Sequence, residues 1–298
     1  MSKILGIGIA TLDIINQVGH YPHEDEEMRA LDQRVARGGN ASNTLEVLIG
    51  LGHQCHFCGT LACDSDSKLI ENSLTELGVT LDHCQRFPEG HAPTSYITIN
   101  QQNGTRTIVH YRDLPELDAE HFQQIDLEPF DWFHFEGRNI GETVRMLKHL
   151  EERRRDQPVS IEIEKERPDI DALYAHADVL IFSSVFIKGR GHEEPEEFMR
   201  RMKVHAPRAI IICPWGNQGA WAQDQDGNAY HAPAHPPEHI VDTLGAGDSF
   251  NAGLIHGLAS GKNLQEALGY ANLLAGIKIG QTGFADLASK ANDQQTSA

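Results

Sequence analysis

A glycine-rich turn leads directly into an apolar helix near the end of the chain, at residues 242–253. Gly245 and Gly247 permit a tight turn that gathers backbone N–H groups into a concave nest. From Ser249 to Leu258, apolar residues recur at helical spacing. The first turn of a helix offers unpaired N–H donors and a partial positive charge. The stretch therefore predicts an anion site that suits a phosphate.

Asp248 lies inside this predicted anion site, where its carboxylate would repel a phosphate. A general base in this position could take the proton from a hydroxyl group as that hydroxyl attacks a phosphoryl group. The alternative is that Asp248 only caps the helix, as aspartate commonly does. A cap alone does not need Gly-Ala-Gly before it, so we interpret Asp248 as a catalytic base.

The rest of the chain alternates apolar strand patterns with helical patterns. This alternation predicts an α/β fold with a doubly wound sheet, whose ligands bind at the carboxyl ends of the strands. We expect strands at 4–10, 54–60, 131–136, 158–163, 178–183 and 209–213. We expect helices from Asn40 to about Gly50 and at 66–77, 140–155, 169–176, 193–205, 246–260 and 264–280, with a polar, frayed tail from Ser289.

Two stretches interrupt the alternation. Residues 14–36 read as an irregular, strand-like excursion, and Asn103-Gly104 marks a hairpin turn between strands at 94–100 and 106–111. We expect both to form a small β lid, residues about 12–36 and 91–112, within a single domain spanning 1–298. A hairpin with one apolar face is not stable alone in water. Its exposed residues should therefore need a partner surface, and these are Tyr96, Thr98, Ile108 and Val109.

A second glycine turn, at Gly38-Gly39, also begins a helix. Asn40 and Asn43 are one helical turn apart, so their amides can point the same way, toward a ligand rich in hydroxyl groups. Capping would explain Asn40 alone. Asp13 follows the first predicted strand, where it either faces the ligand crevice or is an ordinary turn aspartate.

Charge and cysteine content exclude several classes of protein. The net charge of −18 argues against nucleic acid or an anionic membrane surface as the main partner. No apolar run approaches the ~20 residues of a membrane span. Five cysteines, an odd number in a chain of 298 residues, do not make a disulfide framework, so we expect a reduced, cytoplasmic protein. Residues 55–58 contain two cysteines and a histidine but alternate like a buried strand and lack a second ligand pair.

The common nucleotide-binding motifs are incomplete or missing. The glycine pattern that starts at Gly6 lacks its third glycine, which disfavours a nicotinamide oxidoreductase. Residues 257–263 are one residue too short for a Walker loop, and no protein-kinase signature is found. A phosphate nest that contains an aspartate, without these motifs, indicates a small-molecule kinase of another lineage.

Residues 38–43 and 242–248 resemble the two signature stretches of the ribokinase-like (PfkB) carbohydrate kinases. Matches from residue 3 to about 287 are most similar to the ketohexokinases, or hepatic-type fructokinases, within that family. The resemblance implies a nine-stranded central sheet flanked by helices, and a β lid that pairs with a partner's lid in a homodimer. It also implies MgATP-dependent phosphorylation of the C1 hydroxyl of fructose.

The resemblance assigns roles to residues of this chain. Asp248 would be the base, with the Gly245, Ala246 and Gly247 amides as the anion hole. The sugar would contact Asp13, Gly39, Asn40, Asn43, Arg106 and Glu136. ATP would lie beside Lys188, Gly216, Gly219 and Asn272. Arg106 could instead contact the phosphoryl group, or be a surface arginine.

The metal ligands depart from the wider family. Its Asn-x-x-Glu motif, which organises Mg²⁺, has no acidic residue in the corresponding region 182–186, so Glu162 and Glu164 are the candidate Mg²⁺ ligands. A monovalent cation such as K⁺ is a further candidate cofactor. The alternatives are a kinase of another sugar or of a purine nucleoside, and a catalytically silent sugar-binding regulator.

Overall fold

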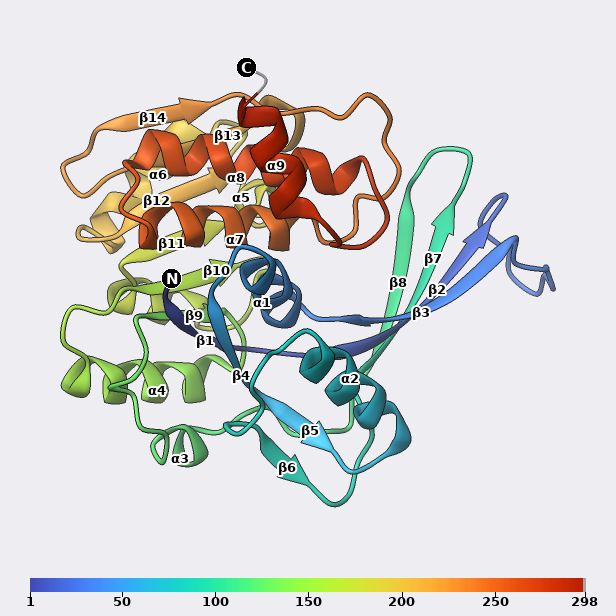
Figure 1. The fold of residues 1–298 in the computed structure, drawn as a ribbon. Helices are drawn as coiled ribbons and strands as arrows, with labels where there is room; N and C mark the ends of the chain where they lie inside the picture. Colours follow the sequence, from blue (N-terminus) through green and yellow to red (C-terminus); the bar gives the residue numbers. More distant parts are fainter. Residues whose placement is uncertain (297–298) are drawn as a thin grey trace.

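The computed structural model describes residues 1–296. An eight-stranded sheet forms its centre, in the order β14-β13-β12-β11-β10-β9-β1-β4 (Figure 1). Six strands, from β12 to β4, are parallel, whereas β13 and β14 add to the edge antiparallel. Their bounds are β1 (Lys3–Ile7), β4 (Gln54–Cys58), β9 (Trp132–Glu136), β10 (Val159–Ile163), β11 (Val179–Phe182), β12 (Ile210–Pro214), β13 (Ala220–Gln223) and β14 (Ala229–Ala232).

Helices cover both faces of this sheet, and each face has its own apolar core. One core contains buried residues of α1 (Asn40–Gly50), α2 (Ser65–Glu76), α7 (Ala246–Ala259), α8 (Leu264–Ile279) and α9 (Leu287–Thr296). The other contains α3 (Ala119–Phe122), α4 (Ile140–Arg153), the 3₁₀ helix η1 (Ile170–His176), α5 (Ser184–Gly189) and α6 (Pro195–His205). The doubly wound α/β fold expected from the sequence is therefore confirmed. No helix within residues 1–296 is long and apolar enough to cross a membrane.

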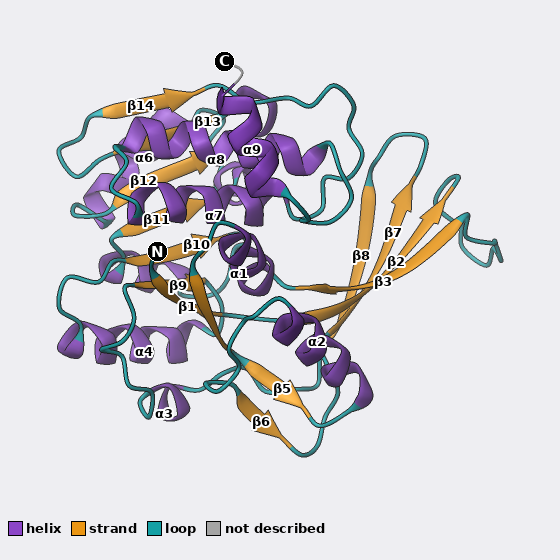
Figure 2. Cartoon of the chain, viewed as in Figure 1, coloured by secondary structure: helices purple, strands orange, loops and turns teal. Residues whose placement is uncertain are grey.

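A second, four-stranded sheet projects from this body (Figure 1). We call it the lid sheet; it consists of β2 (Thr11–Val18), β3 (Asp32–Gly38), β7 (Thr94–Asn100) and β8 (Arg106–Tyr111), in the order β3-β2-β7-β8. The hairpin around Asn103-Gly104 is confirmed by the antiparallel pairing of β7 with β8. The other orange strands in Figure 2, β5 (Thr60–Ala62) and β6 (Gln85–Phe87), form a separate parallel pair.

Several expectations were wrong in detail. Residues 14–36 are strand-like at both ends, as expected, but more regular than expected there, because β2 and β3 pair from Thr11 with Gly38 to Gln17 with Asp32. The central sheet has eight strands within the described residues, not nine. The first strand ends at Ile7 rather than residue 10, since the Ile9 amide leaves the sheet to donate to Glu136. The tail is helical as far as Thr296, because Leu287 and Ala291 of α9 are buried in the core.

Candidate active site

Asp248 lies in the first turn of α7 and is 7% exposed. The preceding Gly245 has φ +82, and a Cβ there would lie 2.4 Å from the Phe284 ring, so this turn requires glycine. The Asn43 side-chain amide donates to Asp248 Oδ2 at 2.7 Å. Burial raises the pKa of Asp248 to about 7; the Asn43 hydrogen bond opposes the rise, and the charge of Glu136 adds to it. A carboxylate with this pKa can accept a proton near neutral pH.

Asn43 on α1 and Asp13 on β2 both lie near Asp248. Gly39 precedes α1 with φ +101, and a Cβ there would lie 2.2 Å from the Ile9 carbonyl oxygen. The buried Arg37 side chain donates to Asn43 Oδ1 at 2.8 Å. Its positive charge lowers the pKa of both Asp248 and Asp13 and so opposes the effect of their burial. Burial raises the pKa of Asp13, although the Thr11 hydroxyl donates to it at 2.8 Å. The two aspartates therefore share the field of one arginine.

Three more carboxylates gather where β9 and β10 end. Glu136 Oε1 accepts the Ile9 and Ala41 amides at 2.9 and 2.7 Å, so this side chain caps α1. The Asn40 amide donates to Glu162 and Glu164 at 3.1 and 3.2 Å. Burial raises the pKa of Glu162 well above its usual value, and Asp248, Glu164 and Glu136 add to the rise. Oxygen ligands in this number suit a divalent cation such as Mg²⁺.

The loop before α7 is held from three sides. Arg34 on β3 donates to Asp242 Oδ2 at 2.9 Å, and Arg106 on β8 donates to the Thr243 hydroxyl at 3.0 Å. From α8, the Lys278 ammonium donates to the Asp242 carbonyl at 3.1 Å and lies 3.5 Å from its carboxylate. The lid sheet and α8 thus both contact the segment that leads to the predicted anion hole.

A cavity of about 490 Å³ opens beside this loop. This volume lies in the range of small-ligand sites. Of the predicted sugar residues, the lining includes Asp13 and Asn43. It also includes Arg34, Asp242 and Lys278, which the sequence analysis missed. The signal for Lys278 was a lone charge in the apolar run 271–279, and its side chain is 1% exposed.

The predicted nucleotide residues form a second group. Gly216 begins the 3₁₀ turn η2 (Gly216–Gln218), and the Lys188 ammonium lies 5.1 Å from the ring centroid of the preceding Trp215. Gly219 packs against Ala232, and the Asn272 amide donates to the carbonyl oxygens of Ala232 and Pro233 at 2.8 and 3.0 Å. The four residues therefore lie in two pairs near strands β12 to β14. Lys188 and Gly216 both lie next to Trp215, and Gly219 and Asn272 both contact the backbone at Ala232 and Pro233.

Comparisons with known proteins identify the family of this chain. The family model described as pfkB family carbohydrate kinase matches residues 1–291. Ketohexokinase of Mus musculus is 40% identical over 290 residues, which cover 95% of this chain and 97% of the mouse protein. Ribokinase of Bacillus subtilis is 24% identical, over 94% of this chain and 93% of its own length.

Solved structures show the same fold. A ribokinase from Thermotoga maritima superposes with a TM-score of 0.80 at 20% identity, over 99% of this chain and 100% of the other. An Arabidopsis thaliana ribokinase, complexed with ribose and ATP, has a TM-score of 0.78 at 20% identity, over 95% and 94%. From the family match and the identity to the mouse enzyme, the chain belongs to the pfkB family of carbohydrate kinases and is a phosphotransferase that acts on a sugar hydroxyl.

Proposed function

We propose that the protein transfers the γ-phosphoryl group of ATP to the C1 hydroxyl of a ketohexose, D-fructose, and so forms fructose 1-phosphate. The observation that carries the reaction is the buried Asp248 carboxylate in the first turn of α7, hydrogen-bonded to Asn43. The substrate class rests on the identity to mouse ketohexokinase along nearly the whole chain.

In this mechanism, Asp248 takes the proton of the C1 hydroxyl as its oxygen attacks the γ-phosphorus. The bond from the γ-phosphorus to the β–γ bridging oxygen breaks, and ADP leaves. The Gly245, Ala246 and Gly247 amides stabilise the charge of the transferring group, because backbone donors at a helix N-terminus favour anions. Asp13, Gly39, Asn40, Asn43 and Arg106 orient the sugar, with Glu136 holding the start of α1.

Glu162 and Glu164 fit a divalent cation, because a cation would offset the cost of burying Glu162 next to Asp248. Mg²⁺ held there would neutralise charge on the ATP phosphates. We assign Lys188, Gly216, Gly219 and Asn272 to the nucleotide side, with Asn272 acting through the Ala232–Pro233 backbone. A K⁺ requirement stays a prediction, which activity in K⁺ and in tetramethylammonium buffers would test.

A substrate panel with coupled ADP detection tests this function. D-fructose should give the highest kcat/KM among ketohexoses, aldoses, ribose and purine nucleosides, and ³¹P NMR should identify the product as the 1-phosphate. A higher kcat/KM for ribose or a nucleoside would assign the alternative substrate within the family. Nucleotide binding without turnover of any acceptor would instead indicate a sugar-binding regulator.

Replacing Arg106 by lysine should raise KM for the sugar by about tenfold, the loss expected for a charge-assisted hydrogen bond. We expect kcat and KM for ATP to stay within about twofold of wild type, because the change removes binding energy that the bound sugar and the transition state share equally. Exposed Arg208, between α6 and β12, provides the matched control, as Arg208→Lys. A joint fall of kcat and kcat/KM would place Arg106 on the phosphoryl group, and no change in any parameter would make it a surface charge.

We also propose that the lid sheet forms a homodimer. Val35, Ile14, Tyr96 and Val109 pair in one row across β3-β2-β7-β8, and Val35, Tyr96 and Val109 are 56%, 49% and 64% exposed. The sequence grouped Ile108 with this surface, but the register pairs it with Ile97 on the opposite face. An exposed apolar row of this kind is typical of a contact surface, and a second copy offers a matching row.

Sedimentation equilibrium tests the dimer. The wild-type protein should be dimeric at micromolar concentration, and Val109→Asp should shift it to monomer because a charge would be buried in the contact. Val204→Asp is the control, since Val204 on α6 is 79% exposed and lies outside the lid sheet. A fully active wild-type monomer at that concentration would rule out a required dimer.

A further inference from the structure

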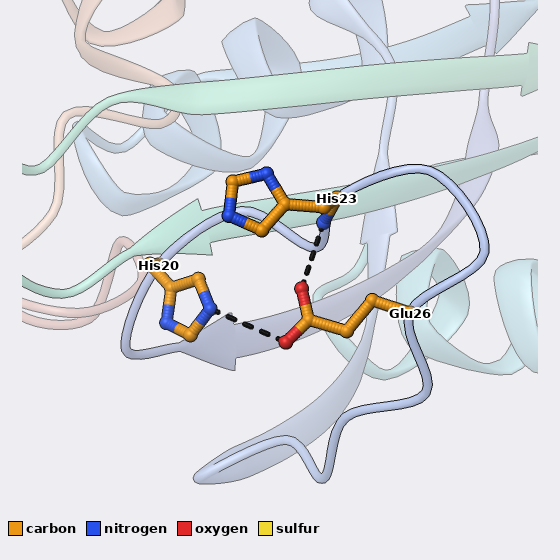
Figure 3. Close-up of side chains that lie close together, drawn as sticks. All are labelled: His20, His23 and Glu26. Carbon is orange, nitrogen blue, oxygen red and sulfur yellow. Dashed lines mark hydrogen bonds and ion pairs between the residues drawn. The ribbon is translucent and has the colours of Figure 1, made fainter.

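The loop at the tip of the lid sheet brings two imidazoles and a carboxylate together (Figure 3). His20, His23 and Glu26 all lie in the segment that joins β2 to β3, and one ligand atom from each lies within 4.8 Å of the others. His20 Nε2 is 3.5 Å from Glu26 Oε1. The sequence analysis did not connect these residues.

Local backbone geometry builds this group. Asp25 has φ +65, a left-handed conformation that aspartate tolerates, and it turns the chain so that Glu26 returns to the two histidines. The His23 amide donates to Glu26 Oε2 at 2.8 Å, and the Glu26 amide donates to the His23 carbonyl at 3.2 Å. These bonds fix the carboxylate beside the imidazoles.

The loop is also tied to the rest of the lid sheet. The hydroxyl groups of Tyr21 and Thr105 are 2.8 Å apart, which connects this loop to the turn between β7 and β8. The Leu31 amide donates to the Gln17 carbonyl at 2.7 Å where the loop rejoins the sheet. The three side chains therefore belong to a loop that is anchored at both ends.

Charge and exposure favour a cation at this position. Glu24, Asp25 and Glu27 flank the group, and the whole chain carries a net charge of −18. A negative potential of this kind raises the local concentration of cations. The His20 side chain is 52% exposed, so an ion can reach it from solvent.

We propose that His20, His23 and Glu26 form a binding site for one transition-metal ion of the Zn²⁺ class. Imidazole nitrogens and a carboxylate oxygen are ligands that Zn²⁺ takes, whereas Mg²⁺ prefers oxygen ligands alone. Three protein ligands leave a further coordination position for water or another donor. A bound ion would link residues 20 to 26 and fix this part of the loop at the tip of the lid sheet. The site is separate from the Mg²⁺ site proposed for catalysis at Glu162 and Glu164.

Isothermal titration of the tag-free full chain with ZnCl₂, in buffer containing Mg²⁺, tests the proposal. The chain has 17 histidines, and others among them can also bind Zn²⁺. The test is therefore the difference in Zn²⁺ binding between the wild type and its variants. His20→Asn/His23→Asn should weaken or abolish one Zn²⁺ equivalent, by about tenfold or more in Kd, since both nitrogen ligands are lost. The control is His239→Asn, which removes an exposed histidine outside the lid sheet, 4.0 Å from Glu238, and should leave that equivalent unchanged.

A second measurement identifies the ligands. Electron paramagnetic resonance of the Cu²⁺-loaded chain should show coupling to two nitrogens, and His23→Asn should reduce it to one. Circular dichroism in EDTA checks that both variants fold as the wild type does. Equal Zn²⁺ affinity in the wild type and the double variant, or a Cu²⁺ signal that both share, would overturn the site.

Discussion

Replacing Asp248 by asparagine should lower kcat by about 10²–10⁴-fold, the usual contribution of a general base. Nucleotide affinity should stay near that of the wild type, because the change keeps the size of the side chain and its place next to Asn43. Rapid-quench or coupled kinetics with separate nucleotide-binding titrations would measure both. A variant that keeps more than about a tenth of wild-type kcat would contradict the assignment, since that loss is below the range for a general base.

Thermal unfolding of Asp248→Asn shows whether the variant loses activity because the base is missing or because the fold is damaged. The folded pKa of Asp248, about 7, lies above its ordinary value of 3.8. The free energy of unfolding therefore contains a contribution from the protonated Asp248 side chain. This contribution is present in full below the ordinary pKa and is lost as pH rises through about 7. Asparagine cannot ionise, so Asp248→Asn should unfold at a higher temperature than the wild type at pH 8, with a smaller difference at pH 5.

The same pKa predicts a pH profile. Wild-type kcat/KM should fall about tenfold per pH unit below pH ~7, because the base is then protonated. The control Asp226→Asn, in the exposed loop between β13 and β14, should follow the wild-type profile and stability. A flat profile between pH 5 and 8 would mean that another group accepts the proton.

The main parallel strands and the glycine turns could be predicted because their signals are local. Apolar runs such as those of β9 and β10 and the Gly245–Asp248 turn carry their structure within a few residues. The bounds of the lid strand β3 could not be predicted, because its pairing with β2 crosses the loop between residues 18 and 32 and most of its residues are polar. The strands β13 and β14 were missed because each has only four residues, too few for a clear alternating pattern, although Asp226-Gly227 between them is a hairpin signal.

The candidate site could be predicted in its residue types but not in all of its contacts. Asp248, Asn43 and Asp13 were expected together, and Arg37 connects them in the structure. Sequence spacing could not show that Glu136 caps α1 or that Asn40 contacts Glu162 and Glu164, because these contacts join segments about a hundred or more residues apart. Only the three-dimensional structure could reveal these contacts.

Lys278 is the residue outside the predicted site whose loss should have the largest effect. Its ammonium donates to the carbonyl oxygens of Asp242 and Gln281 at 3.1 and 3.3 Å and lies 5.6 Å from the Phe284 ring centroid. Phe284 in turn packs against Gly245. Lys278 therefore joins the loop before the anion hole to the turn at 281–284, and we expect it to position the hole.

Lys278→Met keeps most of the buried stem but removes the charge. Leaving a buried charge unpaired typically costs about 3–5 kcal/mol. Arg34 still pairs with the Asp242 carboxylate, so the free energy of unfolding should fall by less than that, by about 1–3 kcal/mol for the partly buried carbonyl groups that lose their donor. Displacing the Gly245–Gly247 amides by about 1 Å should also lower kcat by up to ~10²-fold. Exposed Lys148 on α4 gives the matched control, Lys148→Met, which should change neither quantity.

Kinetics measured well below the unfolding temperature of Lys278→Met separate its two effects. If Lys278 positions the anion hole, kcat should fall while KM for the sugar changes little, because the amides act on the transferring phosphoryl group and not on the bound sugar. Arg34 would still hold the Asp242 carboxylate from the lid sheet, so the loop should keep its approximate place. An unstable variant with wild-type kcat would show that Lys278 only stabilises the fold, and that the Gly245 turn and α7 position the amides without it.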